Sequence, residues 1–282
     1  MIWPLWLLVL VAGVAGAAAG SRAAVAHAIG LAERFGVSAG LVGITIVAIG
    51  TDLPEIANSI SASATGHGDV VVGDTTGSAL AQITLVLAIL ILANPAGFAG
   101  ELDDDGVVRF GGGIAAVAVL LTMLLIIDGE LGRLDGLLLV AVWVASMIGL
   151  ARSRRPRRLL RKPPAREGPG SPVRLLGWLA VVGGSSVALV QAFVQLADTI
   201  GVPELIASTM VLALGTSLPE FVVDWTALRR GAATLALGDL FGSSLVDATL
   251  SIGIGPVIRP IDVSNSAIAS VAIVAAGIAV TT

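Results

Sequence analysis

The sequence predicts an all-α polytopic membrane protein that is built from inverted-topology repeats with discontinuous helices. Three observations lead to this fold class. The 282 residues are 56 % hydrophobic and only 13 % charged, which is about half the charge of a soluble domain. Apolar runs of roughly 20 residues, long enough to cross a bilayer, recur along the chain. A segment of the first half returns in the second half, and each copy places a proline and acidic residues inside an apolar run.

Nine spans are expected from the apolar runs, which are bounded by glycine, proline or charged residues. They cover residues 3–20, 38–63, 70–93, 107–127, 134–151, 173–196, 203–228, 234–257 and 264–282. The segment from Ser21 to Val37 is mildly amphipathic, and we expect it to lie along or just inside the membrane. The chain then consists of a first half at 1–151 (repeat at about 38–93), a linker at 152–172 and a second half at 173–282 (repeat at about 203–257).

The basic residues predict the orientation. The loop at 152–166 contains eight of the sixteen Lys and Arg residues, and loops rich in these residues stay in the cytoplasm. Counting spans outward from this loop places the N-terminus outside and leaves only Arg133 and Arg259 on the outer side. We therefore expect an integral protein of a prokaryotic plasma membrane. A basic linker between spans is ordinary, so no nucleic-acid partner is expected, and the sequence leaves the oligomeric state open.

The two copies of the repeat lie 165 residues apart. Gly-Thr-Asp-Leu-Pro-Glu at 50–55 matches Gly-Thr-Ser-Leu-Pro-Glu at 215–220, and 15 of 38 aligned positions from residue 48 onward are identical. Five spans separate the copies, so the helices with Glu55 and Glu220 are expected to run antiparallel. Each proline lacks an N–H and leaves a carbonyl of the preceding turn without its partner. Such oxygens at membrane depth face protein or a cavity, and a broken helix beside a carboxylate is a candidate cation site of a secondary transporter.

The helix after each Pro-Glu motif is expected to present a polar stripe. Polar side chains recur at every fourth position, and this spacing places them on one helix face. They are Asp74, Ser78 and Gln82 in the first copy, and Asp239, Ser243 and Asp247 in the second. Glycines at 73, 77, 238 and 242 would let another helix approach closely. Asn58 and Asp224, on the Pro-Glu helices, are weaker candidates for the same cavity.

The carboxylates, hydroxyls and freed carbonyls of these segments form an all-oxygen set. The chain has no cysteine, so a bound cation would be held by oxygen or by one of the two histidines. Calcium takes about six to eight oxygen ligands, and sodium accepts fewer from the same pool. A site that holds either calcium or sodium, but not both, is a physical basis for exchange. We expect a transporter of divalent or monovalent cations that has no cofactor and no enzymatic activity.

These segments resemble the sodium/calcium exchanger family of the calcium:cation antiporter superfamily. The similarity rests on residues 50–55 and 73–78 and on their counterparts 215–220 and 238–243, which correspond to the two α-repeats of that family. It implies a ten-helix inverted-repeat fold that moves calcium against sodium by alternating access. It also implies ligand roles for Glu55, Glu220, Asp247 and Gln82, completed by oxygens of Thr51, Thr216, Ser217, Ser78 and Ser243.

The sequence departs from the family pattern in three places. Asp52 occupies a position where the family has serine, as Ser217 still does in the second copy. Gln82 occupies a position where asparagine or aspartate is common, and only nine spans are found where the resemblance implies ten. With Asp74 and Asp239, Asp52 completes the set of candidate metal ligands.

Three alternatives to sodium/calcium exchange stay open. Asp52 raises the number of central carboxylates to four, against the two charges of one calcium ion, so we expect at least one of them to hold a proton when the site is empty. This favours a proton/calcium or a potassium-dependent exchanger. Paired membrane aspartates also occur in intramembrane proteases, but those enzymes have Gly-x-Gly-Asp at one of the two aspartates, whereas Asp239 follows Ala-Leu-Gly here. A passive channel would show a flux that is independent of any counter-ion.

Overall fold

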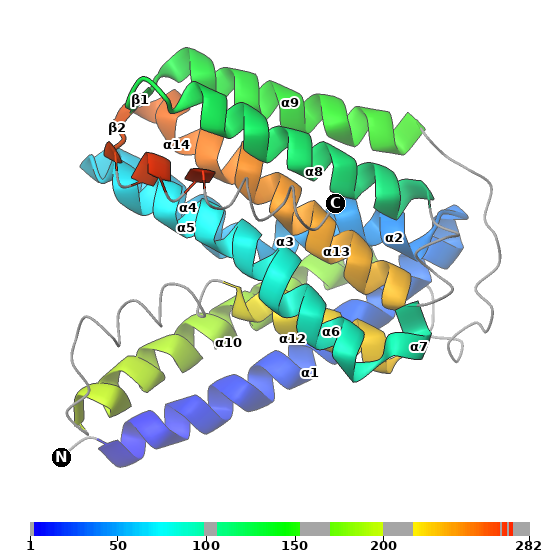
Figure 1. The fold of residues 1–282 in the computed structure, drawn as a ribbon. Helices are drawn as coiled ribbons and strands as arrows, with labels where there is room; N and C mark the ends of the chain where they lie inside the picture. Colours follow the sequence, from blue (N-terminus) through cyan, green and yellow to red (C-terminus); the bar gives the residue numbers. More distant parts are fainter. Residues whose placement is uncertain are drawn as a thin grey trace.

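The structure, a computed structural model, is a bundle of helices with one two-stranded sheet (Figure 1). It describes residues 3–98, 106–152, 170–199, 217–265, 267–269 and 271–272. The first half contains α1 (Trp3–Phe35), α2 (Ala39–Val42), η1 (Gly43–Val47), α3 (Ala48–Thr51), α4 (Leu53–Thr65), α5 (Gly68–Ala81), η2 (Gln82–Val86), α6 (Leu87–Ala93), α7 (Pro95–Phe98), α8 (Gly106–Leu125), β1 (Glu130–Leu131) and α9 (Arg133–Arg152). The second half contains α10 (Pro172–Thr199), α12 (Leu218–Arg229), α13 (Ala233–Val246), η3 (Asp247–Ser251), α14 (Ile252–Ile258) and β2 (Ile261–Asp262). The η segments are π-helical turns.

The two copies of the sequence repeat fold alike. The continuous helix formed by α5, η2 and α6 matches the one formed by α13, η3 and α14, and every boundary between the segments is shifted by 165 residues. The helices α4 and α12 begin at the equivalent residues Leu53 and Leu218, each with a proline in its first turn. The sequence repeat is therefore a structural repeat.

The helix that contains Glu55 is broken, as its proline predicts. The helix α3 ends at Thr51 and α4 begins at Leu53, and the chain bends by 45° between the two parts. Asp52 lies at the break with φ −80° and ψ 6°, outside the helical region. Ser217, its counterpart before α12, has nearly the same conformation, φ −81° and ψ 5°. The segment before Ser217 lies outside the described residues, so the break of the second copy is observed only from its α12 side.

Four of the described helices are long and apolar enough to cross a membrane, and the bent pair from α2 to α4 makes a fifth. The four are Trp3–Phe35, Gly68–Ala93, Arg133–Leu150 and Ala233–Ile258. Two shorter apolar helices, Gly112–Leu125 and Pro172–Ala188, coincide with expected spans. Most of the expected spans at 203–228 and 264–282 falls outside the described residues, so these two remain predictions.

The first helix does not end with the expected span at residue 20, whereas the expected position of Ser21 to Val37 along or just inside the membrane is still a prediction. The helix α1 continues without interruption to Phe35. Arg22 and Arg34 lower the hydropathy of this stretch, but no proline interrupts the helix, and its inner face is buried through a series of small and branched residues. At the point where the first span was expected to end, the hydroxyl of Ser21 lies 2.9 Å from that of Thr226 in α12. Tertiary packing therefore extends the helix beyond the apolar run.

The helices α1 and α10 lie side by side and extend together from one side of the bundle (Figure 1). Their contact is apolar and includes Ala24 and Ala28 of α1 with Leu179 and Val182 of α10. The helix α13 packs against α8, α12 and the segment from α2 to α3, and every residue of α13 except Phe241 is buried. The most enclosed helix of the described chain is thus the one that contains the second polar stripe.

Glycines allow α13 to approach α2 and η1 closely. A Cβ atom on Gly238 would overlap the carbonyl of Gly40, and one on Gly242 would lie 2.6 Å from the Cα atom of Ile44. This confirms the expected close approach for the second copy. The equivalent contacts of Gly73 and Gly77 would involve residues near 205–213, outside the described part, so that half of the expectation is still a prediction.

The ends of α4, α9 and α14 are joined at one end of the bundle. β1 and β2 pair antiparallel, with Glu130 opposite Asp262 and Leu131 opposite Ile261. Beside them, the guanidinium of Arg259 donates to the carbonyl of Ala64 at the end of α4, at 2.7 Å. These contacts tie the two repeats together at the end of the bundle away from the break at Asp52.

Candidate cation site

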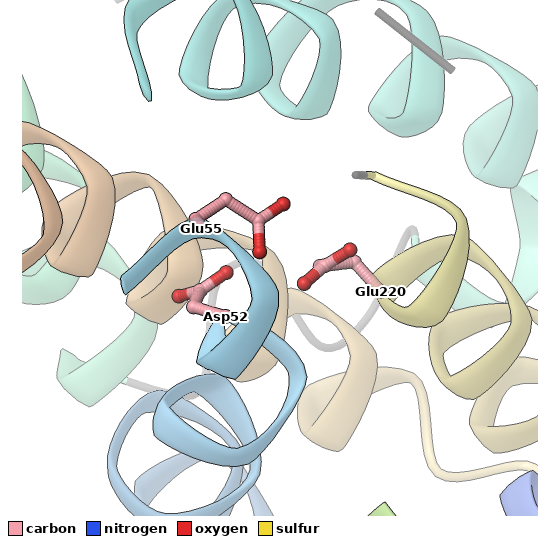
Figure 2. Close-up of side chains that lie close together, drawn as sticks. All are labelled: Asp52, Glu55 and Glu220. Carbon is pink, nitrogen blue, oxygen red and sulfur yellow. The ribbon is translucent and has the colours of Figure 1, made fainter. Parts of the chain in front are cut away.

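Three carboxylates meet at the break in the first repeat (Figure 2). One oxygen each of Asp52, Glu55 and Glu220 lies within 4.8 Å of the other two. All three residues are 0 % exposed, and none of their carboxylate oxygens has a hydrogen-bond partner among the described residues. Buried carboxylates without donors are costly. A cluster of three such groups is therefore suited to a bound cation or to protons.

The two glutamates are placed by the starts of their helices. Glu55 lies in the first turn of α4 and Glu220 in the first turn of α12. The preceding prolines fit the first turn, where the backbone N–H has no helical partner. The N-terminal end of a helix has a partial positive charge that favours carboxylates. Both glutamates therefore point from a helix start toward the other repeat, as Figure 2 shows.

Equivalent residues of the two repeats meet in pairs. Glu55 and Glu220 occupy the same position in the two copies and lie in the same cluster. Gln82 and Asp247 are also 165 residues apart, and the Gln82 Nε2 atom donates to Asp247 Oδ2 at 3.4 Å. Two equivalent residues can touch only beside the axis that relates the repeats. The carboxylate cluster thus lies where the two halves of the molecule meet.

The amide of Gln82 is oriented by a residue that the sequence did not single out. The Ser244 Oγ atom lies 2.9 Å from Gln82 Oε1 and donates to it, which leaves the amide nitrogen toward Asp247. The other oxygen of Asp247, Oδ1, is buried without a described partner. Ser244 lies next to the polar stripe but outside its four-residue spacing, so that no sequence signal distinguished it from a packing residue.

Hydroxyl groups of the two repeats also face one another across the junction. The Thr51 and Ser243 hydroxyl oxygens are 3.3 Å apart, and the Ser217 hydroxyl lies 3.4 Å from that of Ser78. All four side chains are buried. The π-helical turns begin at Gln82 and at Asp247, and such turns recur at functional sites because they change the direction of side chains locally.

The remaining expected ligands have different outcomes. Asp74 accepts a hydrogen bond from the Asn58 amide and is not one of the three clustered carboxylates. Asp239 lies next to Asp224, also outside the cluster. Thr216 lies outside the described residues. Both weaker candidates of the sequence analysis, Asn58 and Asp224, therefore contact the stripe aspartates rather than the three clustered carboxylates.

The surroundings of the cluster are rich in oxygen and lack a described counter-charge. The described side chains that act on Asp52, Glu55, Glu220 and Asp247 are other carboxylates, a hydroxyl and an amide, with no basic group among them. Oxygen ligands of this kind are those that hard cations prefer. The arrangement can bind one divalent ion, or monovalent ions that share its ligands.

Comparison with known proteins identifies the family. The model of the sodium/calcium exchanger protein family matches residues 5–151 and 171–282. The inner membrane protein YrbG of Escherichia coli (strain K12) is 30 % identical over 244 residues, which cover 82 % of this chain and 73 % of that protein. The sodium/calcium exchanger MaX1 of Methanosarcina acetivorans is 26 % identical over 301 residues, which cover 92 % and 84 %.

Solved structures have the same fold. The sodium-calcium exchanger NCX_Mj, soaked with 2.5 mM Na⁺ and 0.1 mM Ca²⁺, superposes with a TM-score of 0.79 at 23 % identity, covering 96 % of this chain and 88 % of that chain. Both α-repeats lie within the residues that the family model matches. The chain is therefore an integral membrane antiporter of the sodium/calcium exchanger protein family, whose members are transporters rather than enzymes and move their ions without a cofactor.

Proposed function

We propose that this protein exchanges calcium for sodium across the cytoplasmic membrane, by alternating access at the carboxylate cluster near the middle of the bilayer. The observation that supports this most directly is the buried cluster of Asp52, Glu55 and Glu220, to which both repeats contribute. A site at the junction of two inverted repeats can open to either side when one part of the protein rocks against the other.

Competition for shared ligands would couple the two ions. In this proposal Glu55 and Glu220 are the principal ligands, and Asp247 Oδ1 and the junction hydroxyls complete the shells. Calcium requires about six to eight oxygens with several carboxylates, whereas sodium ions can each use a subset of the same oxygens. The repulsion among the clustered carboxylates disfavours an empty site, so that the protein changes its access with one kind of ion or the other bound.

The proposed orientation follows from the basic residues. The loop at 152–166 is assigned to the cytoplasm and the N-terminus to the outside, with the halves 1–151 and 173–282 joined by the linker 152–172. The turn at residues 66–68, which joins α4 to α5, then faces outward. The end of α12 at Arg229 faces the cytoplasm.

Transport by the purified protein in sealed vesicles tests the proposal. An outwardly directed sodium gradient is expected to drive uptake of radioactive calcium, whereas a pH gradient alone is expected to drive little. Calcium entry that is equally fast without any gradient would instead indicate a passive channel and would contradict exchange.

One observation favours a second candidate, exchange that is linked to protons or to potassium. Asp52 adds a third carboxylate to the cluster, within 4.8 Å of the two glutamates. Carboxylates this close do not ionise independently, and a proton or an additional monovalent cation relieves their repulsion. Calcium uptake driven by a pH gradient, or dependent on potassium in the presence of sodium, would support this second candidate.

A further inference from the structure

A second pair of carboxyl groups lies beyond the cluster. Asp224 is one helical turn after Glu220 in α12, which packs against α13, and its carboxyl group interacts with that of Asp239 in α13. Both residues are 0 % exposed. None of their four carboxylate oxygens accepts a hydrogen bond from a described donor. The pair is thus as deeply buried as the central cluster, and its carboxylate oxygens, like those of the cluster, have no described hydrogen-bond partner.

The equivalent position in the first repeat has an amide beside its aspartate. There the counterpart of Asp239 is Asp74, which accepts a hydrogen bond from the Asn58 amide. In the second repeat the position of Asn58 is occupied by Val223, and the carboxyl group beside the stripe aspartate is that of Asp224. An amide–acid pair has a donor, whereas two carboxylates facing each other have none. The second pair therefore needs a positive charge from elsewhere.

The side chains found to act on this pair are acids and one hydroxyl. The described groups that act on the two aspartates are each other, Glu220 and the Thr51 hydroxyl, and no Lys, Arg or His is among them. Thr51 also lies close to Glu220. The Thr51 hydroxyl therefore acts both on Glu220 of the central cluster and on Asp239 of the second pair.

We propose that Asp224 and Asp239, with the hydroxyl of Thr51, form a second cation site beside the central cluster. Carboxylate and hydroxyl oxygens suit a hard cation of the sodium or calcium class. The site lies on the side of Glu220 that the proposed orientation turns toward the cytoplasm. It would hold an ion between the central cluster and the cytoplasmic end of the protein. The assignment of that end to the cytoplasm rests on the proposed function, whereas the second site itself does not.

Equilibrium binding to the purified full-length chain tests the proposal. Radioactive calcium and radioactive sodium are measured separately, so that the two arms identify the ion. Asp224→Asn copies the amide–acid pair of the first repeat, and Asp239→Asn neutralises the other partner. Each variant is expected to lose one bound ion per chain in one of the two arms and to keep the binding of the central cluster. Glu130→Gln, which removes an exposed carboxylate, is the matched control and is expected to bind as the wild type does.

The outcomes separate this site from the proposed exchange. If both aspartate variants elute as folded protein and bind as many calcium and sodium ions as the wild type, the second site is wrong; a pair that holds a shared proton would give this result. If Glu55→Gln leaves the central binding intact, the exchange site is wrong but the second site is unaffected.

A measurement on the unmodified chain covers the case in which the variants do not fold. Crystals soaked in strontium or in thallium(I), as stand-ins for calcium and sodium, are expected to show an anomalous peak between Asp224 and Asp239. The lack of that peak in both soaks, at concentrations that fill the central site, would overturn the proposal.

Discussion

Glu55 and Glu220 are held in place by backbone geometry more than by side-chain contacts. Each follows a proline in the first turn of its helix, and neither carboxylate has a described hydrogen-bond donor. Their charges are therefore available to an ion rather than consumed by the protein. The same holds for Asp52, which occupies the break itself.

We expect Glu55→Gln and Glu220→Gln each to abolish calcium transport without loss of expression. The amide keeps the shape of the side chain, but it removes a negative charge and a bidentate contact from the cluster. Sodium-driven calcium uptake into vesicles measures the effect, with the amount of purified protein as the control. Substantial sodium-driven calcium uptake in either variant would contradict the assignment of these residues as ligands.

Asp52→Ser restores the residue that the second repeat has at Ser217. We expect this variant to bind calcium and to exchange it, but with a weaker dependence on pH than the wild type. With one carboxylate fewer in the cluster, protons compete less with the transported cations. The rate of calcium uptake is measured across a range of pH for both proteins. Identical pH profiles would show that Asp52 is only an auxiliary ligand or a charge near the entrance.

The helix formed by α13, η3 and α14 depends on close packing for its position. It contains Gly238 and Gly242 against α2 and η1, and it places Asp239, Ser243 and Asp247 at the junction of the repeats. A shift of this helix would move three candidate ligands at once. Its stability and the geometry of the site are therefore coupled.

We expect Gly238→Leu to lower the stability of the protein by about 1–3 kcal/mol or more, because the new side chain meets the backbone of Gly40, which cannot move aside easily. Gly149→Ala in α9 is the control, since a Cβ there meets nothing within 4 Å and alanine favours a helix. The midpoint of thermal unfolding in detergent is the measurement. Equal midpoints for the wild type and Gly238→Leu would contradict the close approach of α13 to α2.

At the scale of the whole molecule, the proposed orientation in the membrane combines the inverted repeat with the basic loop. The pairing of Glu55 with Glu220, and of Gln82 with Asp247, shows that the two halves meet along one axis. The distribution of the sixteen basic residues then predicts which end of that arrangement faces the cytoplasm.

Single cysteines report the orientation, because the chain has none of its own. A cysteine that replaces Ser153, in the basic loop, is expected to resist a membrane-impermeant thiol reagent added to intact cells. A cysteine that replaces His67, an exposed residue in the turn between α4 and α5, is expected to react. The reverse pattern would overturn the proposed topology, and labelling after lysis confirms that both cysteines are accessible.

The sequence alone determined the membrane class, the repeat and the break before Glu55, and it predicted the two glutamates that the structure brings together. These features are local: hydropathy, a proline and a four-residue period act within one or two helical turns, and the repeat is read by direct comparison. Only the tertiary structure decided the length of α1 and the hydrogen bond by which Ser244 orients Gln82. It also showed that Asp74 is paired with an amide, Asn58, whereas Asp239 is paired with another acid, Asp224. A four-residue spacing places polar side chains on one face of a helix, but it contains no information about which neighbouring helix that face meets. That choice depends on how helices far apart in the sequence pack against each other.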